Sequence, residues 1–317
     1  MHAIATENLT KDYALGFWRK RPYRALDSLT LHVEPGEIFG FLGPNGAGKT
    51  TTLKLLLQLV FPTSGRAEIL GRPVGDAGVR RRIGYLPENP YFYDHLTAVE
   101  LLDYFGRLFH LSSADRAARV PRLLDQVGLG AERRLPLRRF SKGMLQRVGL
   151  AQAIVNEPEV VFLDEPMSGL DPIGRRMVRE LMLGLREGGT TVFFSSHILA
   201  DAEAVCSRVA ILAGGRLVAS GRLTDLLAFG VKGWEVVVDH VDDGVVDRVR
   251  PLADRMTRIA ERRYALELSP EVRPERVLAD LAAIGASVVS LNPLRDTLED
   301  YFMRRVSEDG HQRQVEA

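Results

Sequence analysis

The sequence predicts an α/β fold with a largely parallel sheet, followed by a smaller α+β domain. Short apolar segments, among them Ile38–Gly43 and Val160–Pro166, alternate with segments of helical spacing, which is typical of a largely parallel sheet with helices on both faces. A glycine-rich segment, GPNGAGKTT (Gly43–Thr51), joins one of these apolar strands to a helix. Near residue 230 the pattern changes to short strands and helices that carry no site motif.

The elements follow in a regular order along the first domain, predicted to span residues 1–228. Strands, turns and one helix fill the chain up to residue 97, and the strand in Arg80–Glu88 ends at Pro87. Residues 98–156 have helical spacing and predict a helical subdomain that projects from the sheet. Strand and helix then alternate to residue 221. Residues 229–317 predict an accessory α+β domain, near the lower size limit of an independent domain.

The composition excludes several classes of protein. The chain has 42 basic and 41 acidic residues, whereas dedicated nucleic-acid binders usually carry a clear basic excess. Local basic clusters at 80–82 and 133–139 are expected to be solvated faces. The single cysteine, Cys206, rules out an intrachain disulfide, and no apolar run approaches the ~18 residues of a membrane span. We therefore expect a cytosolic chain, with any membrane role acting through a partner.

The segment Gly43–Thr51 fits the phosphate-loop pattern G-x-x-x-x-G-K-[ST] in the required strand-to-helix context. Glycines let successive backbone N–H groups face a phosphate chain, and the helix N-terminus favours negative charge. We expect Lys49 to neutralise the terminal phosphates and Thr50 to ligate Mg²⁺. The predicted nucleotide-binding residues here are Gly43, Pro44, Asn45, Gly46, Ala47, Gly48, Lys49, Thr50 and Thr51.

Two acids end a second apolar strand, VVFLDEP. The carboxyl ends of parallel strands face the ligand in such sheets, so Asp164 is predicted to hold Mg²⁺ and Glu165 to polarise an attacking water. A third element is RRFSKGMLQR, in which Ser141 can cap a helix and Gly143 leaves the backbone open to an anion. An ordinary helix cap is the alternative for that segment.

Together these motifs resemble the nucleotide-binding subunit of an ATP-binding cassette (ABC) transporter, a P-loop NTPase with a mixed sheet core and a helical subdomain. The resemblance covers roughly residues 3–225. FSKGM resembles the family signature LSGGQ, from which Phe140, Lys142 and Met144 depart. SGLD, which consists of Ser168, Gly169, Leu170 and Asp171, resembles the D-loop, and SSH resembles the switch loop that ends at His197. Tyr13 lies where an adenine-stacking aromatic is expected, with Trp18 and Tyr23 as alternatives.

The resemblance implies a mechanism and a set of partners. Two cassettes, as a homodimer or a heterodimer, would bind two ATPs with Mg²⁺, each between the phosphate loop of one copy and Ser141 and Gly143 of the other. Lys49, Glu165 and His197 would act in catalysis, and the D-loop would couple the two sites. A separate integral-membrane permease would hold the cassettes at the cytoplasmic face of a bacterial inner membrane.

The segment YLPENPYFYDHLT places Glu88 where the family has the glutamine of the Q-loop. A carboxylate ligates Mg²⁺ well, so Glu88 is a predicted metal ligand, and a solvated acid without catalytic role is the alternative. The resemblance makes Tyr91, Phe92 and Tyr93 candidates for permease contact, since exposed aromatics favour protein interfaces. Base stacking is the weaker alternative.

The sequence is compatible with two functions of different classes. The FSKGM and YLPE segments and the tail DTLEDYFM resemble ATP subunits of bacterial ABC-2 type exporters. A soluble ABC ATPase that acts on ribosomes or nucleic acid is the alternative. Such translation-associated proteins usually have two cassettes, and chromosome-maintenance members separate their motifs by long coiled coils. This chain has one phosphate loop and no heptad run, which favours the exporter.

Overall fold

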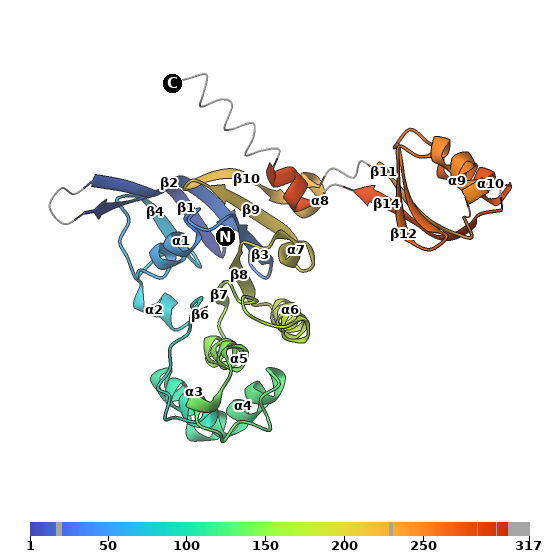
Figure 1. Ribbon diagram of the computed structural model, residues 1–317. Coiled ribbons are helices and arrows are strands. Elements are labelled where there is room, and N and C mark those ends of the chain that lie inside the picture. Colours follow the sequence, from blue (N-terminus) through green and yellow to red (C-terminus); the bar gives the residue numbers. More distant parts are fainter. Residues whose placement is uncertain (17–20, 228–230, 242, 284, 296, 304–317) are drawn as a thin grey trace. The chain divides into compact units, whose positions relative to one another are not determined.

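A computed structural model describes residues 1–16, 21–227, 231–241, 243–283, 285–295 and 297–303 (Figure 1). Its contacts divide the chain into two compact units, residues 1–223 and residues 224–304, whereas the predicted boundary follows residue 228. Trp18 and the predicted frayed tail, residues 307–317, lie outside the described residues.

The first unit is organised around a six-stranded sheet of order β10-β9-β3-β8-β7-β6. All neighbours are parallel except β10, which runs antiparallel to β9. Every residue of β3, β7 and β8 is buried, which explains their unbroken apolar sequences. The strands are β3 (Ile38–Leu42), β6 (Ile83–Leu86), β7 (Val160–Asp164), β8 (Thr191–Ser196), β9 (Arg208–Ala213) and β10 (Arg216–Arg222).

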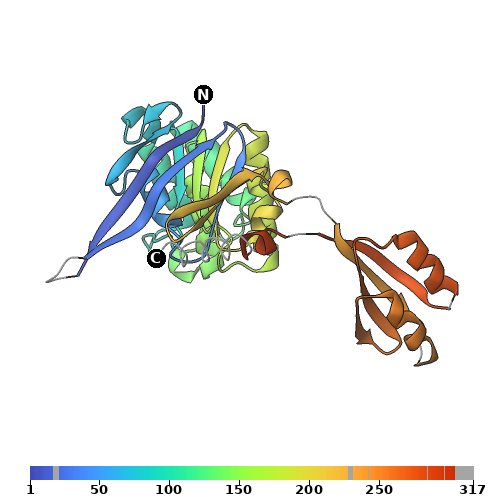
Figure 2. The same ribbon diagram turned by 90° about the horizontal axis from the view of Figure 1, so that it is seen from above.

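One face of this sheet is covered by a second, antiparallel sheet of order β2-β1-β4-β5 and by helix α1 (Lys49–Leu56). Phe39, Phe162 and Phe193 from the first sheet share a buried core with Leu53 of α1 and Leu26 of β2. The alternating strand–helix pattern did not predict this sheet-on-sheet packing. Its strands are β1 (Ile4–Leu15), β2 (Arg21–Val33), β4 (Ser64–Ile69) and β5 (Arg72–Pro73), and β1 and β2 form a long hairpin (Figure 2).

Helices α5, α6 and α7 contact the central sheet through β6, β8 and β3. Helices α3, α4 and α5 pack on one another and form the helical subdomain at one end of this unit (Figure 1). A capping box between Thr97 and Glu100 fixes the start of α3. Besides α1, the helices of this unit are α2 (Ala77–Arg80), α3 (Ala98–Leu108), α4 (Ser113–Gln126), η1 (Leu137–Arg139), α5 (Lys142–Ala153), α6 (Pro172–Glu187) and α7 (Leu199–Glu203).

The second unit is a four-stranded antiparallel sheet of order β12-β13-β11-β14, in which two helices alternate with the strands. This β-α-β-β-α-β sequence is a ferredoxin-like arrangement. Val236, Leu266 and Leu281 lie in its own buried core. Its elements are α8 (Leu223–Leu226), which begins at the boundary, β11 (Val231–Asp239), α9 (Asp243–Val249), η2 (Arg250–Leu252), β12 (Arg255–Ala260), β13 (Arg263–Leu268), α10 (Pro274–Ala283) and β14 (Ser287–Arg295).

Across the described ranges, no helix of either unit has the length and apolar character that a bilayer crossing requires.

Candidate nucleotide site

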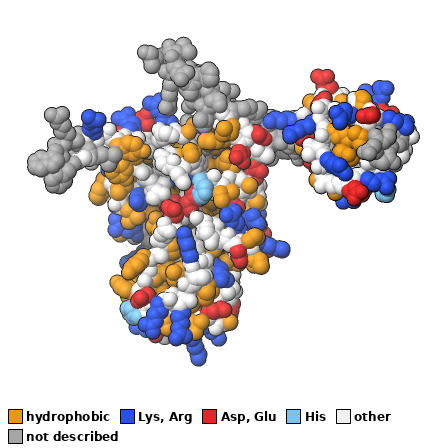
Figure 3. All heavy atoms as spheres, in the orientation of Figure 1, with side chains coloured by type: hydrophobic (Ala, Val, Ile, Leu, Met, Phe, Trp, Pro, Cys, Tyr) orange, Lys and Arg blue, Asp and Glu red, His pale blue; other side chains and the backbone are white. Residues whose placement is uncertain are grey.

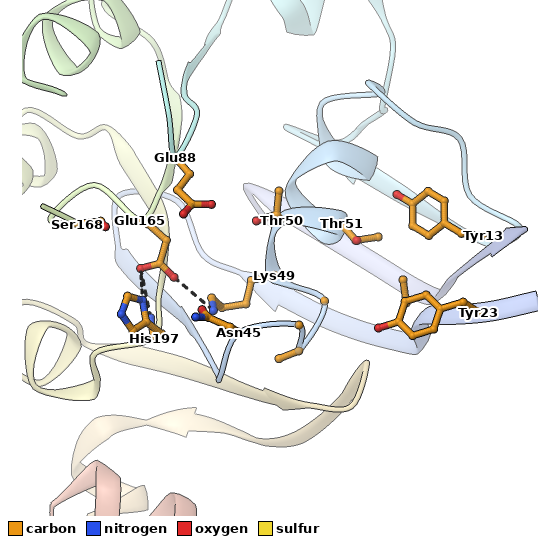
Figure 4. Close-up of a pocket in the computed structure, with 14 residues that line it drawn as sticks. Tyr13, Tyr23, Asn45, Lys49, Thr50, Thr51, Glu88, Glu165, Ser168 and His197 are labelled. Carbon is orange, nitrogen blue, oxygen red and sulfur yellow. Dashed lines mark hydrogen bonds and ion pairs between the residues drawn. The ribbon is translucent and has the colours of Figure 1, made fainter. Parts of the chain in front are cut away.

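A cleft of about 520 Å³ lies at the carboxyl ends of β3, β7 and β8 (Figure 4). It receives side chains from the phosphate loop, from the loops after β6, β7 and β8, and from the β1–β2 hairpin. Its lining residues are Tyr13, Tyr23, Ala25, Asn45, Gly46, Ala47, Gly48, Lys49, Thr50, Thr51, Glu88, Glu165, Ser168 and His197. The structure therefore gathers most of the predicted site residues in one place.

The phosphate loop depends on glycine at two positions. Gly43 and Gly48 have φ angles of +153° and +107°. A Cβ atom at Gly43 would lie 2.3 Å from the Leu212 carbonyl oxygen, and one at Gly48 would lie 2.6 Å from the Ala25 carbonyl oxygen. No side chain caps the start of α1, so the N–H groups of its first turn face the cleft without a side-chain acceptor. This geometry suits an anion at the helix N-terminus.

Lys49 is 6% exposed and points into the cleft from the first turn of α1. Its Nζ donates to the Gly43 carbonyl oxygen at 2.8 Å and lies 3.3 Å from Glu165 Oε1. The ammonium group is thus held between the loop backbone and a carboxylate. Phosphate oxygens that enter the cleft would meet a cation already fixed in position.

Asp164, at the end of β7, is 1% exposed. Its Oδ1 accepts a hydrogen bond from Ser195 Oγ at 2.5 Å, whereas no described residue donates a hydrogen bond to its buried Oδ2. Burial raises the pKa of Asp164, and the hydrogen bond from Ser195 opposes that rise. A buried carboxylate of this kind is stabilised by a nearby cation, so the residue fits the predicted role in binding Mg²⁺.

Mg²⁺ usually binds to one or two protein oxygens together with phosphates and water. The described part of the chain contains no group of three histidine, cysteine or acidic side chains arranged to hold a metal.

Glu165 has a backbone φ of +49°, which is unusual for a residue with a side chain. Its N–H donates to Ser195 Oγ at 3.0 Å, and its Oε2 lies 2.8 Å from His197 Nδ1. Such a conformation costs about 1–3 kcal/mol, and it persists only where surrounding contacts determine it. Here it turns the carboxylate toward both Lys49 and His197 (Figure 4).

Ser195 links the two acids, and the sequence analysis did not assign it a role. It accepts from Glu165 N–H and donates to Asp164 Oδ1. In the sequence, the only sign of this role is the pair of serines that ends the apolar strand β8. The structure shows why it matters: β8 runs parallel to β7, and Ser195 pairs with Asp164.

Tyr13 and Tyr23 are direct partners across the β1–β2 hairpin, and both line the cleft at the end away from Glu165 (Figure 4). The Nζ of Lys11 lies 5.1 Å from the centre of the Tyr13 ring. One region of the Tyr13 ring is therefore already in contact with a cation, whereas the Tyr23 side chain is 47% exposed.

The loop after β6 has one residue in the cleft and others at the surface. Glu88 lines the cleft, and its side chain points toward the space between Thr50 and Glu165 (Figure 4). Tyr91 and Tyr93 are 94% and 62% exposed, and Phe92 is half-buried. None of these three aromatic residues lines the cleft.

The predicted signature segment does not line the cleft of its own chain. Ser141 is exposed and caps α5, where its Oγ accepts from Met144 N–H at 3.2 Å. A Cβ atom at Gly143 would lie 3.3 Å from Leu170, and one at Gly169 would lie 3.4 Å from Cε of Lys142. The predicted signature and D-loop segments are therefore neighbours.

The D-loop residues divide between two environments. Ser168 lines the cleft, while Asp171 caps α6 by accepting from Gly174 N–H at 2.7 Å. This loop thus begins at the nucleotide cleft and ends at an exposed helix start.

Known proteins resemble this chain in sequence over most of its length. A family model described as ABC transporter matches residues 26–168. An uncharacterized ABC transporter ATP-binding protein of Synechocystis is 45% identical, covering 98% of this chain and 86% of the relative. A Nod factor export ATP-binding protein of Cupriavidus metallidurans is 38% identical over 88% of this chain and 91% of the relative.

The fold of this chain also resembles that of a solved structure. That structure is the dimeric, post-hydrolysis state of an ATP-binding cassette bound to ADP and Pi. The match has a TM-score of 0.64 and 26% identity, and it covers 69% of this chain and 98% of that chain.

Proposed function

This chain belongs to the ABC transporter ATP-binding proteins, and we propose on that basis that it powers a membrane exporter whose permease is a separate chain. It binds and hydrolyses ATP, as its family and its match to a cassette with bound ADP and Pi show. The observation that carries the proposed site is the contact of Glu165 with both Lys49 and His197 at the mouth of the phosphate loop.

The roles of the site residues follow from their positions. The phosphate loop and Lys49 bind the β- and γ-phosphates, and Tyr13 and Tyr23 contact the base. Glu165 orients a water for attack on the γ-phosphorus and accepts its proton as the bond to the β-phosphate oxygen breaks. His197, through its contact with Glu165, fixes the direction of that carboxylate. Mg²⁺ held by Asp164 and Thr50 would neutralise charge on the phosphates.

A second copy supplies the remaining part of the site. Ser141 and Gly143 do not line the cleft of their own chain, and Ser141 is exposed. We propose a head-to-tail dimer in which the start of α5 from one copy binds the terminal phosphate held by the other. The D-loop residues Ser168 and Asp171, next to that segment, would then couple the two sites.

Glu88→Gln tests whether Glu88 contributes to metal binding. We expect the Mg²⁺ concentration for half-maximal ATPase activity to rise on the order of tenfold, because a neutral amide replaces a charged oxygen ligand. The measurement is a Mg²⁺ titration of ATP hydrolysis at fixed ATP. Asp94→Asn removes an exposed carboxylate of the same loop that does not line the cleft, and serves as control. A Glu88→Gln titration identical to wild type would leave Glu88 as a solvated acid.

Co-purification tests the exporter proposal. A tagged full-length chain, extracted in detergent from the membranes of its natural host, is expected to retain an integral-membrane protein in a fixed ratio. Relatives similar in sequence include a Nod factor export ATP-binding protein and a bacitracin transport ATP-binding protein, which supports the proposal. Retention of ribosomal RNA or DNA instead, without a membrane protein, would support the alternative of a cassette acting on nucleic acid. The transported substrate depends on the permease.

A further inference from the structure

Asp201 is a buried acid that the proposed mechanism does not use. It lies on α7, four residues after His197, and only 4% of it is exposed. Burial raises the pKa of Asp201, whereas the positive charges of Arg175 and Arg179 oppose that rise. The charge of Glu165 adds to the rise, which places Asp201 near the acid that activates water. A buried carboxylate is costly unless it is paired, so its partners indicate its role.

The partners of Asp201 are two arginines of α6. Arg175 Nη1 lies 3.8 Å from Asp201 Oδ2, and Arg179 Nη1 lies 3.9 Å from Asp201 Oδ1. The two arginines are one helical turn apart and share a face of α6. Their side chains are 33% and 34% exposed, and Figure 3 shows basic side chains at the surface around the position of α6. Asp201 is thus the buried member of an ion cluster that joins α6 to α7.

Both helices of this cluster begin at a loop of the nucleotide site. Asp171, the last residue of the D-loop, caps α6, and its carbonyl oxygen accepts from Arg175 N–H at 2.9 Å. His197 precedes α7, and the carbonyl oxygen of the next residue, Ile198, accepts from Asp201 N–H at 3.3 Å. Short hydrogen-bonded segments therefore connect the cluster to the D-loop on one side and to the switch histidine on the other.

We propose that Asp201 is a positioning residue, whose pairs with Arg175 and Arg179 fix α7 against α6 and so hold His197 in contact with Glu165. His197 Nδ1 lies 2.8 Å from Glu165 Oε2, and the direction of that carboxylate depends on this contact. The inference rests on the roles proposed for Glu165 and His197. It adds a path within one chain from the D-loop, through α6, to the acid that activates the water.

The short length of α7 makes an external support necessary. The helix has only five residues, and no side chain caps its start. Helices of this length gain little stability from their own hydrogen bonds, so contacts with neighbouring elements must hold them in place. Asp201 also lies in the first turn of α7, where an acid interacts favourably with the helix dipole. A test has to separate this purely stabilising effect from the positioning of His197.

Steady-state ATP hydrolysis by full-length variants provides that test. Asp201→Asn keeps the shape of the side chain and removes its charge. We expect kcat to fall about tenfold to a hundredfold while KM for ATP stays near wild type, because Asp201 does not line the cleft. Arg175→Gln with Arg179→Gln should give the same split. Arg176→Gln is the matched control, since this exposed arginine of α6 pairs with Glu180 instead and should keep the wild-type kcat.

Combined variants test the path to His197. If Asp201 acts through His197, Asp201→Asn should lower kcat no further in a chain that already carries His197→Ala. A purely stabilising role would instead lower the free energy of unfolding in urea and reduce activity by the same factor in both backgrounds. If Asp201→Asn does not fold, the arginine pair, whose side chains are partly exposed, is combined with His197→Ala in its place.

The outcomes separate this inference from the proposed function. A wild-type kcat in Asp201→Asn overturns the inference, and so does a loss that multiplies with that of His197→Ala. Either result leaves the proposed roles of Glu165 and His197 intact. Wild-type turnover by His197→Ala alone would overturn the role of His197 and this inference together.

Discussion

Replacing Glu165 with glutamine is expected to reduce ATP turnover by about 10²–10⁴-fold while ATP still binds. The amide has the shape of the carboxylate and keeps a hydrogen-bonding atom near His197, but it cannot accept the proton of the attacking water. Lys49, which provides the cation for the phosphates, remains in place. Phosphate release at saturating ATP and Mg²⁺ measures turnover, and a separate ATP titration measures binding.

Glu180→Gln is the matched control for that experiment. Glu180 is a carboxylate on α6 that pairs with Arg176 at the surface and does not line the nucleotide cleft. We expect this control to hydrolyse ATP at the wild-type rate. Turnover by Glu165→Gln close to that of Glu180→Gln would show that another group activates the water.

Lys49→Ala has the second large expected effect, a loss of ATP affinity of about two orders of magnitude. The change removes a buried cation that donates to the loop carbonyl oxygen of Gly43, and it leaves the Glu165 carboxylate without its lysine partner. An excess of negative charge would then face the incoming phosphates. Calorimetric titration of the full-length variant with ATP and Mg²⁺ measures the change in dissociation constant.

Lys54→Ala is the control for Lys49→Ala, because Lys54 is an exposed lysine in the last turn of the same helix and does not line the cleft. Its ATP affinity should equal that of wild type. An unchanged affinity in Lys49→Ala, with the protein still folded by circular dichroism, would contradict the role of this loop in binding phosphates.

Sequence alone predicted the parts of the site that depend on local chemistry. The phosphate loop needs glycine where φ is positive and a lysine at the helix start, and both requirements are visible along nine consecutive residues. Asp164 and Glu165 follow a buried strand, so their place at the carboxyl edge of the sheet follows from strand direction. The comparisons confirm the ABC family and the P-loop fold class.

Other features depend on contacts between distant segments, which no local pattern encodes. Ser195 lies beside Asp164 only because β8 pairs with β7, and the left-handed backbone of Glu165 has no signature in the residue type. The antiparallel sheet that packs on one face of the central sheet forms because β1 pairs with both β2 and β4. Tyr13 and Tyr23 were alternatives in the sequence, whereas the hairpin register places both in the cleft.

In the proposed dimer, ATP joins two copies of this chain through the cleft of one and the Ser141 segment of the other. Sedimentation velocity of full-length Glu165→Gln tests it most directly, because slow hydrolysis preserves the ATP-bound state. We predict a monomer without nucleotide or with ADP, a dimer with ATP and Mg²⁺, and a monomer with ATP when Ser141→Arg is added to the same chain. A Glu165→Gln chain that binds ATP and stays monomeric, or a dimer that tolerates Ser141→Arg, would contradict the account.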